Sequence, residues 1–76
     1  MITTLVLAAT RLDADEYARD HKLDAAEWRY IHSRAQLMGL KPTDKHQYRV
    51  VRVNGHWLHP ETDNIEQELV LRGIEA

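Results

Sequence analysis

The chain has 76 residues and contains no cysteine and no phenylalanine. Without cysteine there are neither disulfide bonds nor thiolate zinc ligands, and this absence suits a reducing compartment. A chain of this length builds only a small hydrophobic core, so its stability depends on close packing or on a partner. We therefore expect one domain over residues 1–76, with a core of leucine, valine, isoleucine and alanine.

Long apolar runs and a surplus of positive charge are also missing. No run approaches the roughly 18 residues of a membrane helix, and no basic stretch precedes the first apolar run as in a secretion signal. The sequence therefore predicts a cytoplasmic protein without a membrane partner. Charges of both signs are interspersed, with a formal net charge of −2 at pH 7. Because nucleic-acid-binding proteins usually carry a basic surplus, nucleic acid is not the expected partner.

Glycine is scarce, with 3 residues, and the phosphate-binding glycine motifs are absent. Neither GxxxxGK[ST] nor GxGxxG occurs, and the first junction between an apolar run and a helix-like segment, Ala9 to Asp13, contains no glycine. Its side chains would hold the backbone away from a pyrophosphate, so we expect no nucleotide cofactor. The single serine, Ser33, lies outside any nucleophile elbow. We expect no cofactor, no catalytic residue and no enzymatic activity.

Three apolar runs alternate with helix-like segments. Residues 2–9 are typical of a strand buried on both faces, and residues 28–32 and 48–53 predict two further strands. Helical spacing follows over residues 12–23, where Asp13 and Glu16 match a capping pattern, and over residues 33–40, where Ser33 and Gln36 match a capping box. A last helix is predicted to begin between residues 60 and 63 and to stop before Gly73.

This order of elements predicts an α/β fold. Right-handed crossovers place the first strand in the centre of a three-stranded parallel sheet of order 2-1-3, with helices on both faces. Such a βαβαβ-turn-α chain is Rossmann-like and matches half of a P-loop-like doubly wound sheet. Its two open edges favour a homodimer. The Asn54-Gly55 turn leaves two alternatives for residues 56–59, which are either a hairpin arm or a loop.

Two hydroxyl residues and two arginines follow the first two strands. They are Thr10, Arg11, Ser33 and Arg34. Ligands of open parallel sheets bind at the carboxyl ends of the strands, and helix N-termini attract anions. These four residues are therefore candidates for a phosphate or carboxylate pocket. In the alternative interpretation, Ser33 only caps its helix, Thr10 closes the strand and both arginines are solvated.

The segment after the third strand holds Asn54, His56 and Trp57 as candidate interaction residues. An aromatic side chain in a loop such as Trp57 either anchors a partner protein or covers a small core. His56 and His59 are candidate metal ligands, but their spacing matches no established zinc pattern. We therefore expect surface histidines and no metal.

Three stretches resemble very small proteins encoded by phages of actinobacteria. They are residues 4–11 (TLVLAATR), 13–21 (DADEYARDH) and 27–40 (EWRYIHSRAQLMGL), so the resemblance covers most of the first 40 residues and then the valine-rich strand. The chain is also similar to half of a RecA-like helicase lobe without its nucleotide motifs. The resemblance implies a phage accessory protein that binds a host protein in the host cytoplasm, and it assigns no site residues. The alternative function is a module that binds phosphate, a nucleotide or nucleic acid at the carboxyl edge of the sheet.

Overall fold

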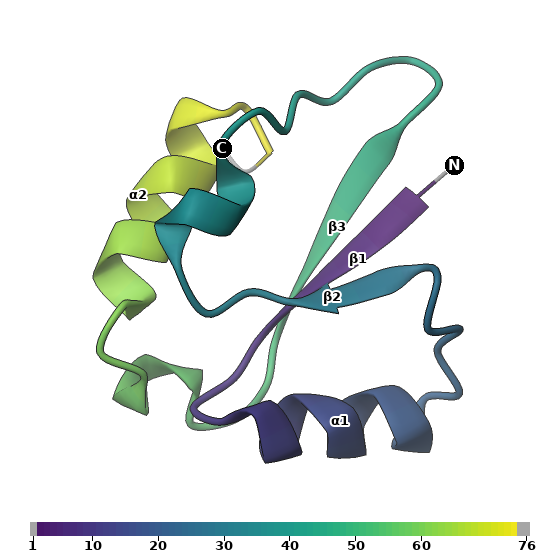
Figure 1. Ribbon diagram of the computed structural model, residues 1–76, viewed down its shortest axis with the longest axis vertical. Coiled ribbons are helices and arrows are strands. Elements are labelled where there is room, and N and C mark those ends of the chain that lie inside the picture. Colours follow the sequence, from purple (N-terminus) through teal and green to yellow (C-terminus); the bar gives the residue numbers. More distant parts are fainter. Residues whose placement is uncertain (1, 75–76) are drawn as a thin grey trace.

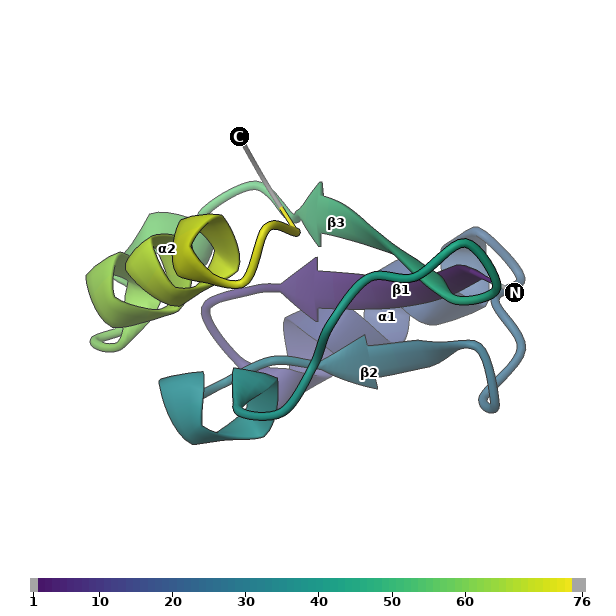
Figure 2. The same ribbon diagram turned by 90° about the horizontal axis from the view of Figure 1, so that it is seen from above.

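The computed structural model describes residues 2–74, which form a three-stranded parallel sheet between helical elements (Figure 1). In chain order the elements are β1 (Ile2–Leu7), α1 (Arg11–Asp20), β2 (Trp28–Tyr30), η1 (Arg34–Leu37), β3 (Gln47–Arg52), η2 (His56–Leu58) and α2 (Thr62–Leu71), where η marks a short 3₁₀ helix. Both strand pairs are parallel and the order is β2-β1-β3, as the view from above also shows (Figure 2). The predicted α/β fold and strand order are confirmed.

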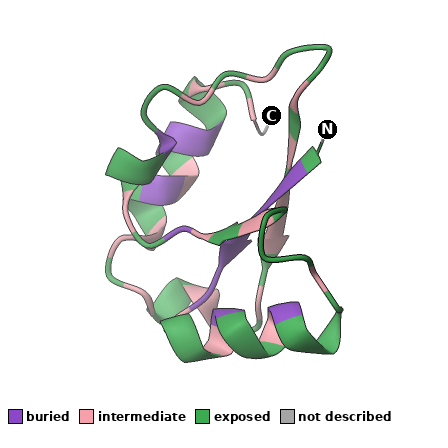
Figure 3. Ribbon diagram, turned by 45° about the vertical axis from the view of Figure 1, so that its right-hand side comes forward, coloured by how far each residue is buried: buried purple, intermediate pink, exposed green. Residues whose placement is uncertain are grey.

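Strand β1 is buried from Thr3 to Leu7 because both of its faces are covered. Leu5 and Leu7 lie on the face that packs against η1 and α2, whereas Val6 and Ala8 lie on the face that packs against α1. The larger cluster comprises Leu5, Leu7, Ile31, Leu37, Ile65 and Leu69. Figure 3 shows this buried layer along β1 and on the inward sides of both α-helices. The core is therefore centred on β1.

Helix α1 begins and ends earlier than the predicted range of residues 12–23. Its N-cap is Thr10, whose Oγ1 accepts the backbone N–H of Asp13 at 3.2 Å, so the expected cap at Asp13 is wrong. At its end Lys22 takes a left-handed conformation with φ of 53°. The backbone N–H of Leu23 then donates to the Ala18 carbonyl at 2.8 Å. This closing turn stops the helix three residues before the predicted end.

The second predicted helix is only a short 3₁₀ helix, η1. Ser33 and Gln36 form the expected capping box at its start. Met38 is already extended, and Gly39 has a φ of 86°, so the chain turns away after Leu37. The predicted range of residues 33–40 was too long because the helical spacing continues past a glycine that takes a left-handed conformation.

Residues 56–59 form a loop that contains η2, so the hairpin alternative is wrong. Gly55 has a φ of 88° and directs the chain into η2 rather than back along β3. Gly73, with a φ of 73°, follows α2 as predicted, and Ile74 packs against the larger core cluster. Within residues 2–74, neither α-helix is long and apolar enough to cross a membrane.

Candidate functional site

The two hydroxyl residues of the predicted anion pocket serve as helix caps. Thr10 precedes α1 and accepts the Asp13 N–H, and Ser33 precedes η1 within the capping box. Both hydroxyl residues therefore have a structural role at the carboxyl ends of their strands. This arrangement agrees with the alternative interpretation of Thr10 and Ser33 as local structural residues.

The two arginines of the predicted pocket do not meet in one cavity. Arg11 Nε lies 3.4 Å from Asp15 Oδ1, one turn further along α1, and both side chains are largely exposed. Arg11 also borders a shallow depression beside Tyr30 and Gln36. Arg34 is exposed and does not border that depression. Anion binding by these residues stays a prediction.

Tyr30 lies at the end of β2 and was not among the predicted site residues. Its hydroxyl donates a hydrogen bond to the Ala8 carbonyl at 3.3 Å, which links the ends of β2 and β1. Burial raises the pKa of Tyr30, the Asp13 carboxylate raises it further, and the Arg11 guanidinium opposes this effect. The phenol is therefore neutral at physiological pH, and its role is that of a hydrogen-bond donor.

The η2 turn presents two large apolar side chains to solvent. Trp57 is 61% exposed and Leu58 is 73% exposed. Trp57 therefore does not cover the core. The alternative in which its indole covers a small core does not agree with the structure. Asn54 is also exposed, in the turn that precedes Gly55. We call the side chains of Trp57 and Leu58 the η2 surface.

His56, the third predicted interaction residue, is directed inward and not toward solvent. Its Nε2 lies 3.8 Å from Glu66 Oε2 on α2, and its ring meets the Trp57 indole edge-on with centroids 5.5 Å apart. Arg52, at the end of β3, holds the same Glu66 carboxylate through two hydrogen bonds of 2.9 and 2.7 Å. The hydrogen bond from Arg52 lowers the pKa of Glu66, and burial only partly opposes it. These contacts connect β3, η2 and α2.

Hydrogen bonds hold the η2 turn on both sides. The His56 carbonyl accepts the Thr62 hydroxyl at 2.8 Å and the His59 N–H at 3.1 Å. The His59 Nδ1 accepts the Glu61 N–H at 3.0 Å, so the proton of the neutral ring lies on Nε2. The η2 surface is therefore carried by a turn whose backbone is held by hydrogen bonds within the domain.

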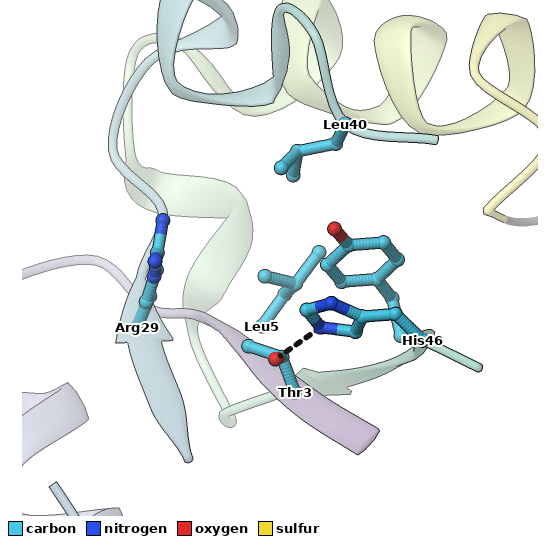
Figure 4. Close-up of a pocket in the computed structure, with 6 residues that line it drawn as sticks. Thr3, Leu5, Arg29, Leu40 and His46 are labelled. Carbon is cyan, nitrogen blue, oxygen red and sulfur yellow. Dashed lines mark hydrogen bonds between the residues drawn. The ribbon is translucent and has the colours of Figure 1, made fainter. Parts of the chain in front are cut away.

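A small cavity lies on the face of the sheet that also packs against η1 and α2 (Figure 4). Its volume is about 40 Å³, and it is lined by Thr3, Leu5, Arg29, Leu40, His46 and Tyr48. A hydrogen bond of 2.8 Å joins Thr3 Oγ1 and His46 Nε2 at one side, and Leu40 lies opposite Leu5 across the opening. This volume holds a few water molecules and not a metabolite. No sequence pattern indicated this cavity, because it depends on the strand register and on the loop that carries His46.

No group of three or more histidine, aspartate or glutamate side chains in the part that the structure describes is placed to hold a metal ion.

Comparisons with known proteins do not identify the chain. The chain matches no protein-family model, no curated protein and no solved structure. Its function therefore has to be argued from its own surface.

Proposed function

We propose that this protein is a non-enzymatic binding module that docks on another protein through the η2 surface. The observation that carries the proposal is the exposure of Trp57 and Leu58 on a turn that is fixed by hydrogen bonds. The resemblance to small phage proteins makes a protein of the host cell the expected partner. In this role the protein acts by occupying a surface of that partner.

Exposure of these two side chains has no explanation in the packing of the domain. Neither Trp57 nor Leu58 belongs to the two hydrophobic clusters or to the half-buried residues around them. Burying a large apolar side chain at an interface contributes about 1.5 to 3 kcal/mol. Tryptophan is enriched among the residues that dominate binding energy, and a rigid turn lowers the entropy that docking costs. The η2 surface thus combines two properties of a binding anchor.

The residues beside the η2 surface indicate what kind of partner fits. Glu61 precedes α2 and Asp63 lies exposed in its first turn. A complementary partner therefore offers an apolar pocket for the indole with basic side chains at its rim. We propose that the ligand of this surface is a folded protein with such a pocket.

Substitution of the anchor tests the proposal. Wild-type protein, Trp57→Ala and the matched control Leu12→Ala are immobilised and exposed to an actinobacterial lysate. Leu12 is a suitable control because it is 66% exposed on α1 and lies outside the η2 turn. We expect at least one protein that wild type and Leu12→Ala retain and Trp57→Ala does not.

The retained protein is then purified and its affinity is measured by calorimetry. Loss of a tryptophan anchor costs about 2 kcal/mol or more, which corresponds to a dissociation constant raised about 30-fold. Circular dichroism confirms that both variants keep the fold. If the proteins captured by wild type and by Trp57→Ala are the same, the η2 surface is not the binding site and the proposal is wrong.

A further inference from the structure

The two edges of the sheet differ in whether they can accept another strand. At the β2 edge, the Gln36 side chain occupies two of the outward backbone groups: Nε2 donates to the Tyr30 carbonyl at 3.1 Å, and Oε1 accepts the His32 N–H at 2.6 Å. An added strand would use these same groups. The end of the β2 edge is therefore covered by a side chain of its own chain.

The β3 edge has no such cover among residues 2–74. The Val53 N–H donates to the Leu7 carbonyl at 2.9 Å, so Val53 points its backbone toward β1. Because these directions alternate along a strand, Arg49 and Val51 also face β1, whereas Tyr48 and Val50 direct their N–H and C=O groups outward. Strand β3 is the last strand on this side of the sheet. The outward backbone groups of Tyr48 and Val50 are thus available for pairing.

Charges around this edge are separated into a basic strand and an acidic helix side. No aspartate or glutamate occurs from residue 45 to residue 60, and Arg49 is exposed on β3. On α1, the acidic side chains of Asp13, Glu16 and Asp20 line a groove of about 220 Å³ that also borders Val53, beyond the end of β3. Their spacing places them on one side of α1. We call these three residues the α1 acidic row.

We propose that β3 pairs in antiparallel fashion with β3 of a second copy of this chain, about a two-fold axis at Val50, to form a continuous six-stranded sheet. In this register, residues whose backbone N–H and C=O groups point outward lie opposite one another. Val50 pairs with the partner's Val50, and Tyr48 pairs with the partner's Arg52. Arg49 then lies opposite the partner's Val51, on the face of the sheet that carries α1. There it is directed toward the α1 acidic row of the partner.

Charge favours a second copy over an acidic peptide at this edge. An acidic extended peptide would bring its carboxylates beside the α1 acidic row, where like charges repel. A second copy instead supplies an arginine at that place, and it does so twice by symmetry. The two Arg49 residues occupy diagonal positions of the paired strands, about 7 to 8 Å apart. The acidic rows offset the repulsion between their two positive charges. The pairing is therefore self-complementary.

This interface is independent of the η2 surface. Strand β3 ends at Arg52, and the chain then turns through Gly55 into η2, which lies below α2 in Figure 1. A variant at one surface leaves the other unchanged, so the two proposals are tested by different substitutions.

Sedimentation velocity and light scattering between about 1 and 500 µM test the pairing. We expect a monomer–dimer equilibrium in wild type that weakens with added salt. Arg49→Glu should raise the dissociation constant at least about tenfold, and the double variant Arg49→Glu with Glu16→Arg should restore association. The control Arg34→Glu makes the same charge change outside the interface and should leave association unchanged. Wild type that remains monomeric at the highest concentration, or a dimer insensitive to Arg49→Glu, would overturn the proposal.

A second variant separates pairing from loss of folding, because Arg49 also donates a hydrogen bond of 3.4 Å to Thr4 Oγ1. Chemical synthesis with N-methylvaline at position 50 removes only an outward N–H and keeps the side chain and the charge. This protein should show a folded circular dichroism spectrum and remain monomeric. In wild type, hydrogen exchange at the Tyr48 and Val50 amides should slow with increasing concentration, whereas Arg49 and Val51 are protected throughout. Concentration-independent exchange at Tyr48 and Val50 would contradict the proposed register.

Discussion

Replacing Gln36 by alanine tests how the short element η1 stays attached to the sheet. The Gln36 amide bridges three backbone groups, since Oε1 accepts the N–H groups of His32 and Ser33 at 2.6 and 3.2 Å while Nε2 donates to the Tyr30 carbonyl. Gln36→Ala removes all of these bonds with one change. It also uncovers the outward edge of β2, which then resembles the open edge of β3.

The expected loss of unfolding free energy in Gln36→Ala is limited because the Gln36 side chain is exposed. A protein hydrogen bond contributes about 0.5 to 1.5 kcal/mol, and water replaces part of that at an exposed site. We therefore expect the free energy of unfolding to fall by about 1.5 kcal/mol, within the range of other lost helix caps. For a domain of this size, the melting temperature falls by about 4 to 8 °C per kcal/mol, so the expected shift is about 6 to 12 °C.

Thermal and urea unfolding, followed by circular dichroism, measure this loss. Gln67→Ala on the exposed side of α2 is the matched control, because it removes the same side chain from a surface position. Gln36→Glu keeps an acceptor for His32 and Ser33 but faces the Tyr30 carbonyl without a proton, so it should fall between wild type and Gln36→Ala. A Gln36→Ala protein that melts within about 2 °C of Gln67→Ala would show that the bridge does not stabilise the fold.

Two further predictions concern charge and backbone conformation. Because the hydrogen bond from Arg52 lowers the pKa of Glu66, the stabilisation by this carboxylate is present above its unfolded pKa of about 4.3 and is lost as the pH falls through its lower folded-state pKa. The unfolding free energies of wild type and Glu66→Gln, measured in urea, should therefore differ at pH 7 and converge in acid. A difference that does not change with pH would contradict this origin. Lys22 has a φ of 53° in the closing turn of α1, so Lys22→Gly should raise the melting temperature, with an expected gain of about 1 kcal/mol, whereas Lys41→Gly in the loop after η1 should not.

The fold was largely predictable from the sequence, because its signals are local. The apolar run of β1 has no alternating polarity, which requires cover on both faces, and the βα alternation then leaves little choice of strand order. The element ends were less accurate, since Lys22 enters a left-handed conformation that the sequence pattern does not show. Gly39 ends η1 for a related reason, and helical spacing alone continued past it.

The candidate site was predictable only in part, because its arrangement depends on contacts distant in sequence. The residues of the η2 turn were identified, but the sequence did not show that His56 turns inward to Glu66 while Trp57 turns outward. That choice follows from the left-handed Gly55 and from the bond between Thr62 and the His56 carbonyl. Likewise, the difference between the two sheet edges depends on the reach of the Gln36 side chain across η1.

The way in which the chain uses its arginines favours protein binding over anion binding. Arg11, Arg52 and Arg72 each lie against a carboxylate, with N–O distances of 3.4, 2.7 and 3.0 Å. A phosphate would have to compete with these internal partners for the same guanidinium groups. Arg29 and Arg49 lie on the two outer strands, with β1 between them, so they do not form a basic cluster. A surface with dispersed cations, a fixed apolar turn and an open strand edge is suited to contacts with protein, where shape and apolar burial supply affinity and single charges set register.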